Sequence, residues 1–139
     1  FEGDKAWWAK RGESTSNKTS CSTQLTTSTI SMIRPKGNGE KFLKVAKACH
    51  KIRILGSSAI EGALVAEGSL DAALDPGSNT HRIVDLAAAK VFLEAAGGVL
   101  VDLNGRPFEY TTDITQRWSG VCAASEALAE KILELLSNS

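Results

Sequence analysis

Hydrophobic positions from about residue 41 onward change repeatedly between helix-like and strand-like spacing. Phe42, Val45, Ala46 and Cys49 recur at the spacing of one helix face, while lysines mark the opposite, solvent-facing side. Short apolar runs bounded by Gly, Pro and Ser are typical of buried strands. The pattern predicts strands at 26–33, 51–55, 70–74, 98–103 and 119–124, and further helices at 58–67, 82–96 and 125–136.

Strands that alternate with helices in this way are typical of an α/β fold, in which helices cover both faces of a sheet. The predicted helix 82–96 runs into Gly97-Gly98, and glycine supplies the left-handed residue that often ends a helix. Residues 14–22 are rich in Ser and Thr and are predicted to form a loop. The aromatic segment at 4–12 is predicted to be a further strand.

The composition is that of one globular domain, because 42% of the 139 residues are hydrophobic and 23% are charged. Sixteen basic and sixteen acidic side chains balance, so we expect neither nucleic acid nor a membrane surface as a partner. Three cysteines without Cys-x-x-Cys spacing argue against a disulfide framework and for a reducing compartment. No apolar run approaches the roughly 20 residues of a membrane span, so we expect a cytoplasmic protein.

The turn formed by Gly56, Ser57 and Ser58 is the first candidate site, because it lies where a predicted strand ends and a helix begins. A serine here can simply cap the helix by accepting a hydrogen bond from a free backbone N–H. The same helix start also offers N–H groups and partial positive charge to an anion or a sugar hydroxyl. The residues alone leave both interpretations open.

Two carboxylates are further candidates. Asp85 lies in the first turn of an apolar helix, where a buried charge needs a partner such as Arg82 or a hard metal ion. Asp75 precedes Pro-Gly-Ser-Asn-Thr, where an aspartate more often begins a turn than takes part in catalysis. Neither His50 nor His81 stands at a spacing that suggests a hydrolase triad.

Two segments together resemble the C-terminal half of the inositol monophosphatase superfamily. They are RILGSSAIEGALVAEGSLDAAL, beginning at Arg53, and VDLAAAKVFLEAAGGVLVDLNGRPF, beginning at Val84. The superfamily pattern here is a Gly-Ser or Gly-Thr-Ala turn, a Trp-Asp pair that opens a helix, and Ala-Gly-Gly before an apolar strand. The form with Val84 in place of tryptophan is most similar to the archaeal branch that combines fructose-1,6-bisphosphatase and inositol-1-phosphatase activity.

The resemblance implies both a fold and a chemistry. The fold is the C-terminal half of a layered αβαβα sandwich, with a mixed sheet between helices. The chemistry is Mg²⁺-dependent hydrolysis of a sugar or inositol phosphate monoester, with Asp85 as one magnesium ligand. The substrate side of the site would consist of Gly56, Ser57, Ser58, Asp75 and Arg82. Arg82 would face a second phosphate.

The resemblance also implies that most of the catalytic machinery is absent from the chain. The superfamily's glutamate pair and its Asp-Pro-x-Asp-Gly-Thr motif, which supply most metal ligands, do not occur in these 139 residues. Because the chain also opens on Phe1 rather than Met, we expect a fragment without catalytic residues of its own that is inactive by itself. Residues 1–36 would be the last strands of an N-terminal domain plus the Ser/Thr-rich loop, and 37–139 the C-terminal α/β domain.

Two expectations about partners remain. Dimers are common in the superfamily, so a homodimer is expected. The alternative to the enzyme fragment is a non-catalytic α/β module that binds a sugar phosphate or a protein partner through the same surface.

Overall fold

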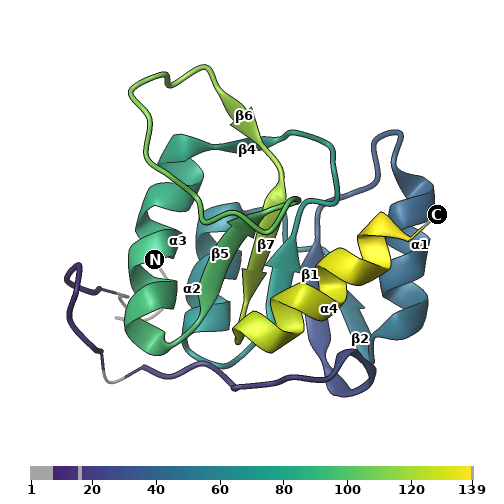
Figure 1. The fold of residues 1–139 in the computed structure, drawn as a ribbon, viewed down its shortest axis with the longest axis horizontal. Coiled ribbons are helices and arrows are strands. Elements are labelled where there is room, and N and C mark those ends of the chain that lie inside the picture. The colour runs from purple at the N-terminus through teal and green to yellow at the C-terminus, as the bar shows by residue number, and fades with distance from the viewer. Residues whose placement is uncertain (1–7, 16, 139) are drawn as a thin grey trace.

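The computed structural model describes residues 8–15 and 17–138, and its centre is a five-stranded sheet (Figure 1). The strands are β1 (Thr29–Met32), β2 (Lys51–Arg53), β3 (Ala72–Leu74), β5 (Val99–Asp102) and β7 (Gly120–Ala123). They lie in the order β2-β1-β3-β7-β5, with β1 parallel to β2 and β3, and β7 antiparallel to β3 and β5. The predicted mixed sheet is confirmed.

Four α-helices of the described residues cover the two faces of this sheet. They are α1 (Gly39–Ala48), α2 (Ser58–Ala66), α3 (Ile83–Ala96) and α4 (Glu126–Ser137). Leu74 and Val121 point to the face covered by α1 and α4, whereas Ala73 and Cys122 point to the face covered by α2 and α3. Because successive strand residues point to opposite faces, both faces of the central strands are apolar. In Figure 1, α4 crosses the front of the sheet.

Helix ends follow the local sequence. α3 ends at Gly97, whose φ of +93° is the left-handed conformation predicted there, and the N–H of Gly98 donates to the carbonyl of Leu93 at 2.7 Å. α4 begins after Ser125, whose Oγ accepts a hydrogen bond from the N–H of Leu128 at 3.1 Å.

The N-terminal part differs from the prediction. Residues 4–7 of the predicted strand lie outside the described residues, and residues 8–12 form a coil and a turn instead of a strand. The Ser/Thr-rich region is a loop, as predicted, followed by the 3₁₀ helix η1 (Leu25–Thr27). This loop is fastened to the sheet by Thr19, whose hydroxyl donates to the carbonyl of Ala124 at 2.8 Å.

The segment 29–33 belongs to the sheet of the following region. β1 comes from the predicted first segment, 1–36, yet it pairs with β2 and β3 from the predicted second segment, 37–139. The division into two domains stays a prediction. None of the helices in residues 8–15 and 17–138 is long and apolar enough to cross a bilayer.

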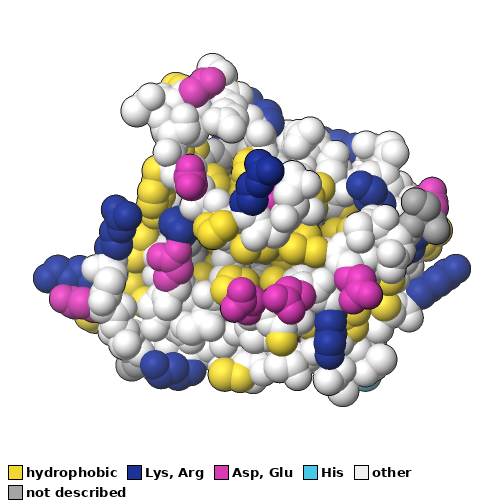
Figure 2. Space-filling model, in the orientation of Figure 1, with side chains coloured by type: hydrophobic (Ala, Val, Ile, Leu, Met, Phe, Trp, Pro, Cys, Tyr) yellow, Lys and Arg dark blue, Asp and Glu magenta, His cyan; other side chains and the backbone are white. Residues whose placement is uncertain are grey.

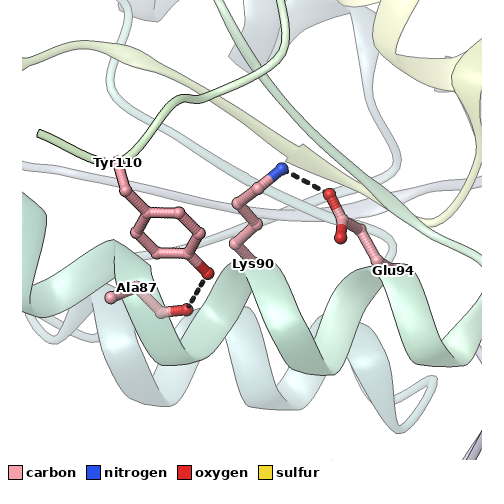
Figure 3. Close-up of polar contacts among 4 residues, drawn as sticks. All are labelled: Ala87, Lys90, Glu94 and Tyr110. Carbon is pink, nitrogen blue, oxygen red and sulfur yellow. Dashed lines mark hydrogen bonds and ion pairs between the residues drawn. The ribbon is translucent and has the colours of Figure 1, made fainter. Parts of the chain in front are cut away.

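A second, two-stranded sheet lies beside the end of the main one and was not predicted. β4 (His81–Arg82) pairs antiparallel with β6 (Arg117–Trp118), so α3 begins at Ile83. The loop between β5 and β6 returns onto α3, where the Tyr110 hydroxyl donates to the carbonyl of Ala87 at 3.1 Å, beside the Lys90–Glu94 ion pair (Figure 3). This loop therefore packs against the first half of α3, and β4 of the second sheet leads directly into this helix.

Candidate functional site

A cleft of about 530 Å³ opens where the three parallel strands β2, β1 and β3 end. The loops after the carboxyl ends of parallel strands share one edge of the sheet, which is where α/β proteins commonly bind ligands. Five of the six site residues predicted from the sequence line this cleft: Gly56, Ser57, Ser58, Arg82 and Asp85. The cleft thus brings together residues that lie about thirty positions apart in the chain.

The Gly-Ser-Ser turn presents two uncommitted hydroxyls. Gly56 has a φ of +81°, which strongly favours glycine at this corner. Ser57 is the N-cap residue of α2 by position, but its side chain makes no capping hydrogen bond. Within the described residues, neither Ser57 nor Ser58 has a side-chain hydrogen-bond partner, and both line the cleft. The helix-capping interpretation is therefore wrong for these side chains.

Asp85 lies on the cleft wall in the first turn of α3. Its Oδ2 accepts a hydrogen bond from the backbone N–H of Arg82 at 3.2 Å, which fixes the carboxylate at the helix start. No described side chain forms an ion pair with it, so the guanidinium partner considered for Asp85 is not found. A half-buried carboxylate facing a cleft is a suitable oxygen donor for a hard cation.

Asp75, the sixth predicted residue, lies under the cleft and not in its wall. Its side chain is fully buried, and its two oxygens accept hydrogen bonds from the N–H groups of Gly77, Ser78 and Thr80 and from the Thr80 hydroxyl, at 2.6 to 3.0 Å. Burial alone would raise the pKa of Asp75, but these hydrogen bonds outweigh it and lower the pKa. The carboxylate shapes the loop that carries Thr80 into the cleft wall. Contact of Asp75 with a substrate hydroxyl stays a prediction.

Three polar residues of the cleft lining were not predicted from the sequence: Arg34, Lys36 and Thr80. Arg34 and Lys36 lie in the loop that follows β1. The useful signal was the pair of basic residues at the end of an apolar strand. With Arg82, they give the cleft three basic side chains against one acidic one, which favours an anionic ligand.

His81 is the remaining polar group near the site. It is 5% exposed, and neither ring nitrogen has a hydrogen-bond partner in the described part of the chain. Burial lowers the pKa of His81, and the charges of Asp75 and Asp85 offset only part of this effect. The ring is therefore neutral at physiological pH.

The described residues do not form a complete metal site. Residues 8–15 and 17–138 contain no group of three His, Cys, Asp or Glu side chains that could hold a metal ion. Asp85 by itself fits the oxygen chemistry of a hard cation, but magnesium prefers octahedral coordination with further ligands. Any metal bound here needs donors beyond this set.

The chain is similar in sequence to proteins that are named as phosphatases. A 42% identity over 101 residues links the chain to a fructose-1,6-bisphosphatase/inositol-1-monophosphatase of Methanothermobacter thermautotrophicus, covering 70% of this chain and 36% of that protein. A bifunctional NADP phosphatase/NAD kinase of Methanococcus maripaludis is 32% identical over 139 residues, 99% of this chain and 24% of that protein. The chain thus spans about a quarter to a third of the length of these relatives.

Solved structures share the fold. A protein from Pyrococcus horikoshii, described as having similarities to inositol-1 monophosphatase, superposes with a TM-score of 0.73 at 31% identity, covering 88% of this chain and 46% of its own. A structure of an inositol monophosphatase-fructose 1,6 bisphosphatase superposes with a TM-score of 0.74 at 27% identity, covering 86% and 46%. Residues 4–139 match the inositol monophosphatase family. The chain belongs to the inositol monophosphatase family.

Proposed function

We propose that the chain is part of a Mg²⁺-dependent phosphatase that hydrolyses phosphate monoesters of sugars or inositols, and that it supplies the sugar-binding wall and one metal ligand. The observation that carries this proposal is the basic cleft, which gathers five of the six residues implied by the family resemblance. Similarity to a fructose-1,6-bisphosphatase/inositol-1-monophosphatase and to an NADP phosphatase/NAD kinase supports a small phosphorylated substrate.

Each cleft residue has a part in this proposal. The hydroxyls of Ser57 and Ser58 hydrogen-bond the sugar or inositol ring, because no described residue uses them. Arg82, with Arg34 and Lys36 across the cleft, attracts the phosphate groups. Asp85 holds one magnesium ion through a carboxylate oxygen. Magnesium, when bound, lowers the pKa of a coordinated water and stabilises charge on the phosphoryl oxygens.

The binding step can be tested by titrating the ¹⁵N-labelled chain with fructose 1,6-bisphosphate and with inositol 1-phosphate, with and without Mg²⁺. We expect shifts of the amide signals of Ser57, Ser58 and Arg82, and their loss in Arg82→Ala. Arg117→Ala is the matched control, because Arg117 pairs with Arg82 across β4 and β6 but does not line the cleft. Absence of shifts with either ligand at millimolar concentration would contradict the proposal.

The metal step is tested in the same titration. Asp85→Asn should abolish the Mg²⁺-dependent part of the shifts, whereas Glu94→Gln, on the same helix but outside this cleft, should not. We expect no phosphate release by the isolated chain, because the described residues provide no cluster of metal ligands. Mg²⁺-dependent phosphate release by the chain alone would show that the expected inactivity is wrong.

The second candidate is a non-catalytic module that binds a sugar phosphate or a protein partner. Two exposed apolar side chains favour it. Ile54 and Val84 line the same cleft with 52% and 66% of their surface exposed. Ile54→Ser with Val84→Ser would leave phosphate binding intact under the phosphatase proposal and would abolish partner capture under this one. A homodimer stays part of the proposal and is tested by light scattering after size-exclusion chromatography.

A further inference from the structure

Glu61 is a buried carboxylate for which the proposed mechanism has no use. It lies on α2, one turn after the Gly-Ser-Ser turn, and its side chain is only 2% exposed. Among the described residues it forms no ion pair with a Lys, Arg or His. A buried carboxylate without a cation is costly unless hydrogen bonds compensate it, so its partners indicate its role.

Those partners come from two elements. The Ser31 hydroxyl of β1 donates to Oε1 of Glu61 at 2.8 Å, and Ser31 is itself fully buried. The backbone N–H groups of Gly56 and Leu55 lie close enough to the carboxylate to lower its pKa. Leu55 and Gly56 are the two residues directly before Ser57. Glu61 therefore contacts the turn, and the Ser31 hydroxyl in turn fixes the position of Glu61.

We propose that Glu61 is the positioning residue of the cleft, whose carboxylate fixes the 55–58 turn and thereby the direction in which Ser57 and Ser58 face the ligand. The inference rests on the proposed function, in which those two hydroxyls contact the sugar. Glu61 lies behind the turn, is absent from the cleft lining and acts only through the backbone that it orders.

Backbone geometry supports this assignment. The carbonyl of Ser57 accepts the backbone N–H of Glu61 at 2.9 Å, which ties the turn to the residue that carries the carboxylate. Gly62 places α2 hard against α3, since a Cβ at this position would lie 2.5 Å from that of Ala89. This contact limits movement of α2 toward α3, while the Ser31 hydrogen bond links Glu61 to β1.

Protonation of Glu61 should loosen the turn. Burial raises the pKa of the Glu61 carboxyl, and the Ser31 hydroxyl and the N–H groups of Gly56 and Leu55 offset only part of this effect. The titratable group facing it is the Cys122 thiol of β7, whose pKa is raised to about 12 by burial and by the Glu61 charge, so that it stays neutral. Ser31 on β1 also faces the carboxylate. A protonated carboxyl has one acceptor fewer for the turn.

The experiment is a pH titration of the full 139-residue chain, labelled with ¹⁵N and with ¹³C in glutamate side chains. We expect the amide signals of Leu55 and Gly56 to titrate with the same midpoint as the Glu61 side-chain carbon, above the ordinary 4.5. In Glu61→Gln this transition should vanish, and hydrogen-exchange protection of both amides should fall by about tenfold or more at pH 7. Glu67→Gln, at the other end of α2, is the matched control and should change neither.

Two results would overturn the assignment: amides of Leu55 and Gly56 that ignore the Glu61 titration, or unchanged protection in Glu61→Gln. If Glu61→Gln does not fold, the titration of the unmodified chain still decides, because it needs no variant. The ligand arm separates this inference from the proposed function. Amides that follow Glu61 without any ligand shift at Ser57 and Ser58 would refute the proposed function only, and ligand shifts with amides that ignore Glu61 would refute the positioning role only.

Discussion

Asp75→Asn tests how the loop under the cleft is held. The fully buried carboxylate accepts two hydrogen bonds at each oxygen: Oδ1 from the N–H groups of Gly77 and Ser78 at 3.0 and 2.6 Å, and Oδ2 from the N–H and hydroxyl of Thr80 at 3.0 and 2.9 Å. Asparagine keeps one acceptor oxygen and replaces the other by an NH₂ group, which only donates. Two donors therefore lose their partner and face another donor.

The expected loss of stability follows from the number of hydrogen bonds broken. Hydrogen bonds to a charged group contribute about 1.5–3 kcal/mol each. The amide will turn its NH₂ toward Thr80, whose hydroxyl can rotate away, so we expect the lower part of the range, about 3 kcal/mol in the free energy of unfolding. With a urea m-value of about 2 kcal/mol per molar, the denaturation midpoint should fall by about 1.5 M.

Asp113→Asn is the matched control. Asp113 accepts the same pair of hydrogen bonds, from the N–H and hydroxyl of Thr115 at 2.9 and 2.6 Å, but on the surface, where water can replace them. Its urea midpoint, followed by circular dichroism, should stay at that of the unmodified chain. A midpoint for Asp75→Asn equal to that of Asp113→Asn would refute the reasoning, because it would show that burial adds nothing to the hydrogen-bond pattern.

Further outcomes can be measured by the same denaturation assay. Gly62→Ala should lower the free energy of unfolding by about 1–3 kcal/mol, since the new Cβ would lie 2.5 Å from that of Ala89, whereas Gly39→Ala, with open space around it, should not lower it. Because burial lowers the pKa of His81 below 6.5, the unfolded chain binds more protons below this pH, and the free energy of unfolding should fall as the pH drops below 6.5. His81→Leu should remove this part of the slope between pH 7.5 and 5.5, and an unchanged slope would assign it to another group.

The hydrophobic pattern was sufficient for the long elements and insufficient for short ones. α2, α3 and α4 begin and end within one residue of the predicted ranges, and Ser125 at the start of α4 and Gly97 at the end of α3 mark two of these ends. β4 and β6 have two residues each, so neither shows a period. They exist because His81 pairs with Trp118 and Arg82 with Arg117, positions that lie 35 or more residues apart. Such pairing is a property of the tertiary fold.

The resemblance to the inositol monophosphatase superfamily pointed to only some of the residues that form the cleft. The position of Asp75 under the cleft could not be predicted, because the turn residues after it do not show that four donors converge on one carboxylate. Arg34 and Lys36 were missed since their relevance depends on β1 lying between β2 and β3. Glu61 carried a signal that was passed over, a single carboxylate in an otherwise apolar helix segment, which is the argument applied to Asp85.

Other surfaces of the chain carry different chemistry. On the face shown in Figure 2, hydrophobic side chains lie among acidic ones. A hollow of about 380 Å³ next to α4 is lined by Glu94, Glu126 and Glu130 together with Leu133 and residues of β5. An acidic, partly apolar hollow repels phosphate groups, whereas the cleft with Arg34, Lys36 and Arg82 attracts them. The distribution of charge therefore distinguishes the two hollows, although the chain as a whole has no net charge.

Two buried carboxylates each hold a different loop of the cleft wall. Glu61 holds the turn after β2, and Asp75 holds the loop after β3. The loop after β1, which carries Arg34 and Lys36, is tied to the second of these, because the side-chain amide of Asn38 donates to the Ser78 hydroxyl at 2.9 Å. Glu61→Gln should therefore shift amide signals of residues 55–58 and leave 33–38 unchanged, and Asp75→Asn should shift 33–38 and 75–80 but leave 55–58 unchanged. Overlapping shift maps would mean that the cleft wall behaves as one unit.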